Sequence, residues 1–416
     1  MKTFVVLICL LGLQVFAQQQ EVILEGKQQG QSVPILLFSG AVTSDSVLLE
    51  KADEANVWSE RIVKALQVSG TIKVTDKMPD TLTATSLVPN AKLEVKKASS
   101  GGAVTISLLA GDAVKPYWFQ SFSLIDKYFD NALKAVSTIH TQLVGEPGFA
   151  SARIYYAGST TTGNRELFST NLFGLNRSQL TSDGTILISP TVSPDGSKVA
   201  YTSFRNGNAD VWIQSTSGGP ANILVSTPYV DSSPRFAPDG KTVAFATTVD
   251  GNCEIYTIES NSTNKNRITF ASGIDTSPSW SPAGDRIVFT SDRSGNPQVY
   301  TMASDGTDIR RITYEGEYND SPVWSPRGDR IVYVRRENGV FQIYQCDPAG
   351  VTHKRLLYYS EDQKDPAFVP GGFRISFVTV WQGIPGIALL TPETGEVDMI
   401  VTNVVAQRPV WGPPTP

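Results

Sequence analysis

The stretch "SPSWSPAGDRIVFTS" (277–291) decides the fold, because the chain carries three further versions of it. These are "SPTVSPDGSKVAYTS" (189–203), "SPRFAPDGKTVAFAT" (233–247) and "SPVWSPRGDRIVYVR" (321–335). The prolines that open the repeat are spaced by 44, 44, 44, 44 and 43 residues: Pro190, Pro234, Pro278, Pro322, Pro366 and Pro409. A fixed period of this length indicates an array of identical supersecondary units.

One repeat has the pattern of four short strands. The residues after the opening proline form the first, and Pro-Asp-Gly (194–196 and 238–240) makes a tight turn in which glycine accepts positive φ. An alternating second strand follows, and later segments such as "QVYTMA" (298–303) and "RRITY" (310–314) supply the third and fourth. Four antiparallel strands per repeat predict one blade of a β-propeller.

The two ends of the repeat array complement each other. "RIYYAGS" (153–159) is an early second strand with no first strand before it, whereas "RPVWGP" (408–413) is a first strand with nothing after it. An open solenoid would need capping repeats, and none is visible. We therefore predict a six-bladed propeller in which the C-terminal strand completes the first blade.

The first 150 residues lack the repeat and have a mixed pattern. Strands are expected at 33–40 and 71–76 and in a meander over 91–123, and apolar stripes predict helices around 58–66 and 125–143. The fold class is therefore an α/β N-terminal domain followed by an all-β six-bladed β-propeller closed by the C-terminal strand.

The extreme N-terminus has the order of a secretory signal peptide. Lys2 precedes an apolar run from Phe4 to Phe16, and Ala17 ends a small-residue cleavage site. That run is shorter than the roughly 20 residues of a membrane span, so we expect export without membrane insertion. The expected organisation is a signal peptide at 1–17, an α/β domain with a flexible N-terminal tail at 18–147, and the propeller at 148–416.

Charge and composition disfavour several function classes. The chain has 35 Lys and Arg against 40 Asp and Glu and no basic block, so nucleic acid is not an expected partner. It has only two histidines and no G-x-S-x-G elbow, which argues against a Ser-His-Asp hydrolase and against a histidine metal cluster. Asp195, Asp239 and Asp305 each precede glycine and are expected in turns. We expect no cofactor, no metal and no catalytic set.

One position of the repeat carries a recurring large apolar side chain, at Phe236, Trp280, Trp324 and Trp411. We expect these side chains to pack between neighbouring blades instead of forming a platform for sugars.

The chain resembles the TolB family of periplasmic propeller proteins. The resemblance rests on "PSWSPAGDRIVFTSDRSGNPQVYTMASDGTDIRRIT" (278–313), on "EVILEGKQQGQSVPILLFSG" (21–40) and on "GEPGFASARIYY" (145–156), which includes Phe149 and Arg153. The chain departs from the family pattern at "FVPGGFR" (368–374) and "WGPPTP" (411–416). The resemblance implies a non-enzymatic, monomeric periplasmic adaptor of the Tol–Pal envelope system, which supports outer-membrane integrity and constriction during cell division.

The loops that lead into the innermost strands are the candidate partner-binding site, since loops carry the variable surface of a propeller. They are polar and mostly acidic, and solvated turns are the alternative interpretation. The candidate residues are Val230, Asp231, Ser232, Ser233, Asp275, Thr276, Ser277, Asn319, Asp320, Lys364 and Arg408. Their carboxylates are expected to be accessible to Arg or Lys of a partner.

The resemblance implies which partners these surfaces receive. The peptidoglycan-associated lipoprotein Pal would dock at this mouth, and the inner-membrane protein TolA would contact the N-terminal tail. Two other function classes stay open at this point. One is a propeller that binds a glycan or peptide in its channel, and the other is an enzyme that relies on carboxylates alone.

Overall fold

The computed structural model describes residues 22–28, 31–37, 72–75, 91–97, 103–110, 118–123, 133–134, 137–138, 148–159, 163–261 and 263–415. The chain divides into two compact units, one of Met1–Ser151 with Pro414–Pro416 and one of Ala152–Pro413. Among the described residues, no helical segment has the length and hydropathy that a membrane span requires.

The described part of the first unit contains two antiparallel three-stranded sheets. Their orders are β2-β1-β3 and β4-β5-β6, with β1 at Val22–Gln28, β2 at Gln31–Leu37, β3 at Ile72–Thr75, β4 at Ala91–Lys97, β5 at Ala103–Ala110 and β6 at Trp118–Ser123. Strand β1 lies inside the segment predicted to be a tail, and it pairs with both β2 and β3. Residues 133–134 and 137–138 are helical. The predicted leader at 1–17, the helix around 58–66 and the remainder of 125–143 lie outside the described residues.

The second unit consists, in its described residues, of six antiparallel four-stranded sheets. We name them blades I to VI and give their strands from the innermost outward. Blade I has β30 (Ala406–Trp411), β7 (Ile154–Ser159), β8 (Arg165–Thr170) and β9 (Ser178–Gln179). Blade II has β10 (Leu187–Val192), β11 (Lys198–Ser203), β12 (Asp210–Ser215) and β13 (Asn222–Val225). Blade III has β14 (Asp231–Phe236), β15 (Thr242–Thr247), β16 (Glu254–Glu259) and β17 (Lys265–Arg267).

The remaining three blades follow the same order. Blade IV has β18 (Asp275–Trp280), β19 (Arg286–Ser291), β20 (Gln298–Ala303) and β21 (Arg310–Arg311). Blade V has β22 (Asn319–Trp324), β23 (Ile331–Glu337), β24 (Val340–Cys346) and β25 (His353–Arg355). Blade VI has β26 (Lys364–Phe368), β27 (Ile375–Trp381), β28 (Ile384–Leu390) and β29 (Val397–Thr402).

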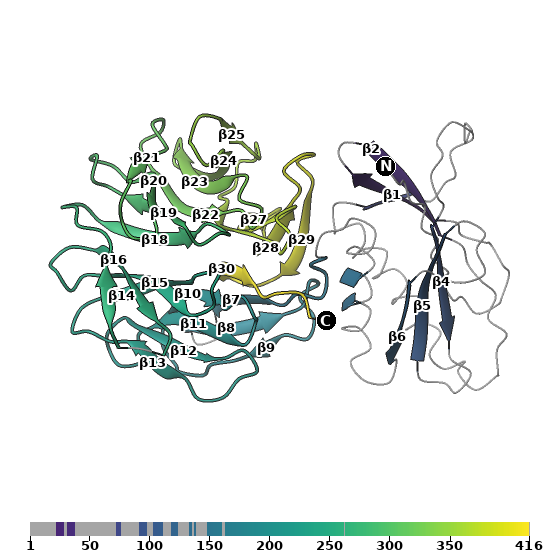
Figure 1. Cartoon of the computed structure of the whole chain (residues 1–416), viewed down its shortest axis with the longest axis horizontal. Coiled ribbons are helices and arrows are strands. Elements are labelled where there is room, and N and C mark those ends of the chain that lie inside the picture. Colours follow the sequence, from purple (N-terminus) through teal and green to yellow (C-terminus); the bar gives the residue numbers. More distant parts are fainter. Residues whose placement is uncertain are drawn as a thin grey trace. The chain divides into compact units, whose positions relative to one another are not determined.

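The predicted ring closure is confirmed. Strand β30, drawn in yellow, lies beside β7 from the start of the unit (Figure 1), and the two are antiparallel with Ala406 opposite Gly158 and Trp411 opposite Ile154. The backbone N–H of Gly412 donates to the carbonyl of Arg153 at 2.9 Å, which continues the pairing past the strand. The first and last segments of the propeller therefore share one sheet.

The recurring aromatic side chains pack between blades, as predicted. Phe236 of blade III belongs to a buried cluster with Ala200 and Val211 of blade II. Trp324 of blade V lies in a cluster with Val288 and Val299 of blade IV. Their burial between the sheets adds apolar contact that joins neighbouring blades.

Every innermost strand contains a β-bulge just before the repeat proline. The bulge residue has positive φ, between 46° and 54°, in all six blades: Ser189, Ser233, Ser277, Ser321, Asp365 and Arg408. The pairing register shifts at each of these sites. Non-glycine residues rarely adopt such angles, and a bulge turns a side chain away from its regular position. One residue per blade is thereby set at the same level of the innermost strands, which line the central channel of a propeller.

Candidate functional site at the mouth face

The antiparallel order of each blade divides the loops between two ends of the propeller. The turns that join first to second and third to fourth strands lie at one end, which we call the turn face. The loops that join second to third strands, and those that lead into the next innermost strand, lie at the other end, which we call the mouth face. All the candidate partner-binding residues belong to the mouth face or to the bulges just below it.

The candidate residues differ strongly in exposure. Val230 and Lys364 are exposed, whereas Ser232, Ser233, Thr276, Asp320 and Arg408 are partly buried. Asp231, Asp275, Ser277 and Asn319 are buried, and the first two are 0% exposed. The expectation that Asp231 and Asp275 offer accessible carboxylates to a partner is therefore wrong. They are the first residues of β14 and β18 and point into the protein, beneath the loops.

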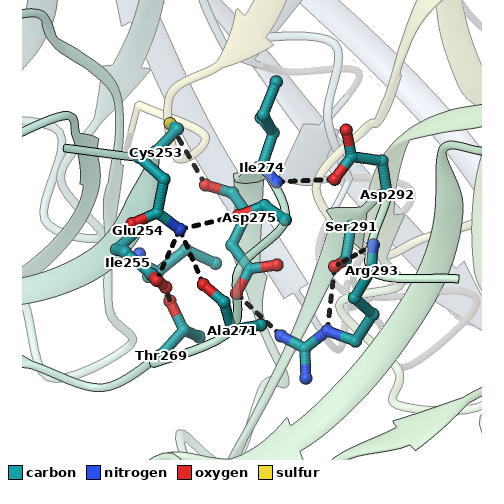
Figure 2. A network of polar contacts seen from close by, with 12 residues as sticks. Cys253, Glu254, Ile255, Thr269, Ala271, Ile274, Asp275, Ser291, Asp292 and Arg293 are labelled. Carbon is teal, nitrogen blue, oxygen red and sulfur yellow. Dashed lines mark hydrogen bonds and ion pairs between the residues drawn. The ribbon is translucent and has the colours of Figure 1, made fainter. Parts of the chain in front are cut away.

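Asp275 is held by an ion pair and a backbone contact (Figure 2). Arg293 donates from Nη2 to Asp275 Oδ2 at 2.7 Å, and its Nε donates to Ser291 Oγ at 2.9 Å. The backbone N–H of Asp275 donates to the carbonyl of Cys253 at 2.8 Å. The Arg293 guanidinium also lies over the ring of Tyr300, at 5.2 Å. The contacts tie the start of β18 to the hairpin between β19 and β20.

A second part of this network holds the loop before Asp275. Thr269 Oγ1 donates to Glu254 Oε2 at 2.6 Å, and Asn252 Nδ2 donates to Glu254 Oε1 at 2.8 Å. Asn252 also donates to the carbonyls of Ala271 and Gly273, at 2.6 and 3.0 Å. The loop over residues 268–274 is thus fixed from beneath by side chains of its own blade.

The same construction recurs with amides in the next two blades. Asn319 donates from Nδ2 to Gln298 Oε1 at 2.9 Å, and Gln363 donates from Nε2 to Gln342 Oε1 at 3.0 Å. The first pair stands one repeat after Glu254 and Asp275, and the second stands two repeats after them. In each case the backbone N–H of the later residue donates to a carbonyl of the preceding blade, as that of Asp275 does. The candidate carboxylates therefore occupy a recurring place of the repeat, at the start of an innermost strand, from which side chains hold the mouth loops.

Burial leaves the two candidate carboxylates in unusual electrostatic surroundings. Burial raises the pKa of Asp231 above its ordinary value, and the neighbouring Thr247 hydroxyl and the backbone N–H of Thr227, which donates to Oδ2 at 2.7 Å, oppose the shift. Burial likewise raises the pKa of Asp275, against the opposing effect of Ser291 and Arg293. The Oδ1 atom of each is buried and has no hydrogen-bond partner among the described residues. The charged form of Asp231, which has no ion-pair partner in this part of the chain, is the more costly of the two.

Replacing Asp231 with Asn is expected to stabilise the protein at neutral pH. The folded state holds the Asp231 proton more tightly than the unfolded chain does. The protonated carboxyl therefore contributes to the stability of the wild type below the ordinary pKa near 3.8, and this contribution is lost as pH rises through the raised pKa. An unsatisfied buried group costs about 1–3 kcal/mol, so the melting temperature of D231N should exceed that of the wild type by a few degrees at about pH 8. The difference should shrink toward pH 4 when both proteins are melted across that range.

Asp195 provides a control, because its replacement by Asn should change the stability in the opposite direction. Hydrogen bonds from Ser193 and Ser197 lower its pKa to about 2 in an exposed turn. D195N should therefore be less stable than the wild type at neutral pH. The difference in melting temperature should shrink as pH falls from the ordinary pKa near 3.8 toward 2. A D231N variant that is no more stable than the wild type at neutral pH would contradict the raised pKa of Asp231.

The structure reveals an aromatic rim on the mouth face that the candidate set did not include. We define it as Phe270, Tyr314 and Tyr358, which are 72, 69 and 79% exposed and stand at one position of three successive repeats. A guanidinium covers one face of each ring: Arg267, Arg311 and Arg355 lie 4.7, 4.9 and 4.8 Å from the respective ring centroids. The sequence contained a signal, because "RITF", "RITY" and "RLLY" repeat with the same spacing, although it also fits a fourth strand.

Each rim arginine is itself fixed to the backbone. Its Nε donates to the carbonyl two residues on, at 2.7 Å for Arg267, 2.5 Å for Arg311 and 2.6 Å for Arg355. The rings are therefore oriented before any partner arrives, so docking would cost little side-chain entropy.

Other exposed apolar side chains gather on the same face. Those in or beside its loops are Ile186, Phe204, Tyr229, Val230, Ile274, Tyr359, Val380, Ile384 and Val405, whereas the turn face has Leu175, Ile309 and Val351. Exposed apolar patches mark interaction sites, and Tyr and Arg are enriched at the energetically dominant positions of protein interfaces. The mouth face is thus suited to bind a protein surface.

Among the residues that the structure describes, no group of three or more His, Cys, Asp or Glu side chains is placed to hold a metal ion. Asp195, Asp239 and Asp305 accept hydrogen bonds from the next residues of their own turns, which is the turn role predicted for them.

Comparisons with known proteins agree with this architecture. The family described as "TolB beta propeller domain" matches residues 140–415. The chain is 39% identical over 72 residues to "Tol-Pal system protein TolB" of Desulfosudis oleivorans, which is 17% of this chain and 16% of that protein. It is 35% identical over 95 residues to the protein of the same name from Methylobacillus flagellatus, 23% of this chain and 22% of the relative. The matched stretches thus span less than a quarter of these relatives.

A solved structure covers almost the whole chain. The crystal structure of TolB from Acinetobacter baumannii superimposes with a TM-score of 0.73 over 99% of this chain and 97% of that one, at 20% sequence identity. This likeness shows the same fold, and the family match over residues 140–415 shows that the chain belongs to the TolB family.

Proposed function

We propose that this protein is a non-enzymatic periplasmic adaptor of a Tol–Pal type envelope system, and that its mouth face docks a peptidoglycan-associated lipoprotein. The observation that carries the proposal is the aromatic rim, which offers three oriented rings on three successive blades. Family membership supports it, as do the matched relatives, which are named as Tol-Pal system proteins.

The remaining parts of the proposal concern the N-terminal segment. Residues 1–17 would direct export and be removed, and residues 18–31 would contact an inner-membrane partner of the TolA type. With the lipoprotein at the other surface, the protein would couple the inner membrane to the cell wall, which supports outer-membrane integrity and constriction during division.

Site-specific photocrosslinking in the native envelope tests the docking face. A photoreactive phenylalanine in place of Tyr314 should capture the lipoprotein as one discrete adduct, because this ring stands 69% exposed on the mouth face. The matched control is Val351, which is 79% exposed on the turn face and should give no such adduct. Equal capture from both positions, or capture from Val351 alone, would contradict docking at the mouth face.

A further inference from the structure

A tyrosine and an arginine stand opposite each other on the outer strands of three successive blades. The cross-strand partners are Tyr256 and Arg267 in blade III, Tyr300 and Arg311 in blade IV, and Tyr344 and Arg355 in blade V. Each arginine is also the one whose guanidinium covers a ring of the aromatic rim. The three pairs therefore adjoin the rim, on the mouth face.

In blades III and V a carboxylate joins the tyrosine hydroxyl to the guanidinium. The hydroxyl of Tyr256 donates to Asp250 Oδ2, and Arg267 Nη1 lies 2.8 Å from the same oxygen. The hydroxyl of Tyr344 donates to Glu337 Oε1 at 2.5 Å, and the rim arginine of blade V lies 3.2 Å from Oε2. The side chains of these two acids are 36 and 30% exposed, so a carboxylate at this position is accessible from solvent.

Blade IV has the same tyrosine and arginine but no acidic residue of its own at the bridging positions. The residues that match Asp250, Glu254 and Glu337 in the repeat are, in that order, Ser294, Gln298 and Arg293. Glu254 belongs to the comparison because it also pairs with Arg267, at 2.8 Å. Arg293 is a cation and pairs with Asp275, at 2.7 Å. The sequence of blade IV thus keeps the two donors of the bridge and lacks its acceptor.

Arg311 has no ion-pair partner among the residues that the structure describes. Its Nε donates to the carbonyl of Thr313 at 2.5 Å, and its guanidinium lies over the ring of Tyr314 at 4.9 Å. The next acidic residue along the chain, Glu315, lies 3.5 Å from Arg335. A protein that covers the rim would remove water from the Arg311 charge, which opposes binding unless that protein supplies an anion. The other two rim arginines have carboxylates of their own.

We propose that the docked lipoprotein places a carboxylate between the hydroxyl of Tyr300 and the guanidinium of Arg311, where blades III and V have a carboxylate of their own. This inference rests on the proposed docking at the mouth face and adds the chemical group that the partner brings to it. A guanidinium donates two parallel hydrogen bonds to a carboxylate, and the phenol hydroxyl is a further donor. The Arg293 guanidinium, 5.2 Å from the ring centroid of Tyr300, adds positive charge nearby. One charge pair among apolar rings would fix the register of the partner on the rim.

Calorimetric titration of the full chain with the lipoprotein tests the inference on the variant S294D. Ser294 matches Asp250 in the repeat, so the new carboxylate should pair with Arg311 and occupy the position of the partner's group. S294D should bind the lipoprotein at least about 30-fold more weakly than the wild type, because the partner's carboxylate loses its cation and meets a like charge. The melting temperature should stay the same or rise, since a charge gains a partner. The control S294N has an uncharged side chain of the same size and should bind as the wild type does.

Variants of the lipoprotein identify the source of the carboxylate. Its exposed Asp and Glu residues are replaced one at a time by Asn and Gln, and one further version has an amidated C-terminus. One of these changes should weaken binding to the wild type and have little effect on the residual binding to S294D, because the two changes remove the same contact. A side-chain variant with this behaviour identifies an acidic residue, and the amidated version identifies the terminal carboxylate. If none of them weakens binding to the wild type, the inference is wrong.

R311M is the second variant, and it decides the question should S294D fail to fold. It keeps the length of the side chain without the charge, and it should also weaken binding at least about 30-fold. Wild-type affinity in both folded variants would overturn the inference while docking at the mouth face stands. Absence of lipoprotein binding by the intact wild type would instead overturn the proposed function, and the inference with it.

Discussion

Deleting residues 405–416 is expected to lower the melting temperature by more than about 10 °C and to abolish a single cooperative transition. The deletion removes β30, the innermost strand of blade I, and leaves the edge of β7 unpaired. It also removes Val410 from a buried cluster and the hydrogen bond from Trp411 Nε1 to Ser376 Oγ, at 2.9 Å. Trp411 is partly buried, and loss of a fully buried Trp costs about 3–5 kcal/mol, so this side chain together with the lost strand removes a large part of a total stability of roughly 5–15 kcal/mol.

Two controls make this result specific to ring closure. Deletion of Pro414–Pro416 alone leaves β30 in place and should retain most of the stability. A synthetic peptide of residues 402–416 added to the truncated protein should restore part of the lost transition, because the vacated edge accepts a strand. A truncated protein that melts together with the intact one would show that β30 does not close the ring.

Replacing Phe270, Tyr314 and Tyr358 together by Ala is expected to weaken lipoprotein binding by at least about 100-fold. Hot-spot side chains contribute about 2 kcal/mol or more each, and aromatic rings oriented in advance are typical of them. The melting temperature should change little, because the three rings are 72, 69 and 79% exposed and are absent from the buried clusters. Affinity and melting temperature are measured on the same preparations.

The matched control replaces two exposed apolar residues of the turn face, Ile309 and Val351, by Ala. This variant should bind as the wild type does. Unchanged affinity in the rim variant would remove the aromatic rim from the interface, and an equal loss in both variants would indicate a general effect on folding.

The propeller itself could be predicted because each repeat carries its structure locally. The 44-residue spacing of the prolines set the number of blades, and the surplus strand around Trp411 predicted closure with the strand at 153–159. Strands with alternating apolar residues and Pro-x-Gly turns depend on the preferences of neighbouring residues, which can be read directly from the sequence.

The candidate site could be predicted only in part, because burial depends on contacts between distant residues. Asp231 and Asp275 stand among polar loop residues, and their sequence context does not distinguish a solvated turn from a buried anchor. The distinction comes from partners elsewhere in the chain, such as Arg293 for Asp275 and, in the equivalent amide pair, Gln298 for Asn319. Such pairs form only once the strands of one blade have paired, as for Asp275 and Arg293, or once two blades have met, as for Gln298 and Asn319.

The rim was missed for a different reason. Phe270, Tyr314 and Tyr358 each stand three residues after the end of a short fourth strand, and an aromatic residue in that place is also typical of a strand. Their exposure follows from the end of pairing, since β17 ends at Arg267, β21 at Arg311 and β25 at Arg355.

Calorimetric titration of the intact protein with the peptidoglycan-associated lipoprotein of the same organism tests the central claim most directly. We predict saturable binding with one lipoprotein per chain, with affinity lost in the rim variant and retained in the Ile309 and Val351 variant. Absence of binding by the intact, folded protein would contradict the proposed function.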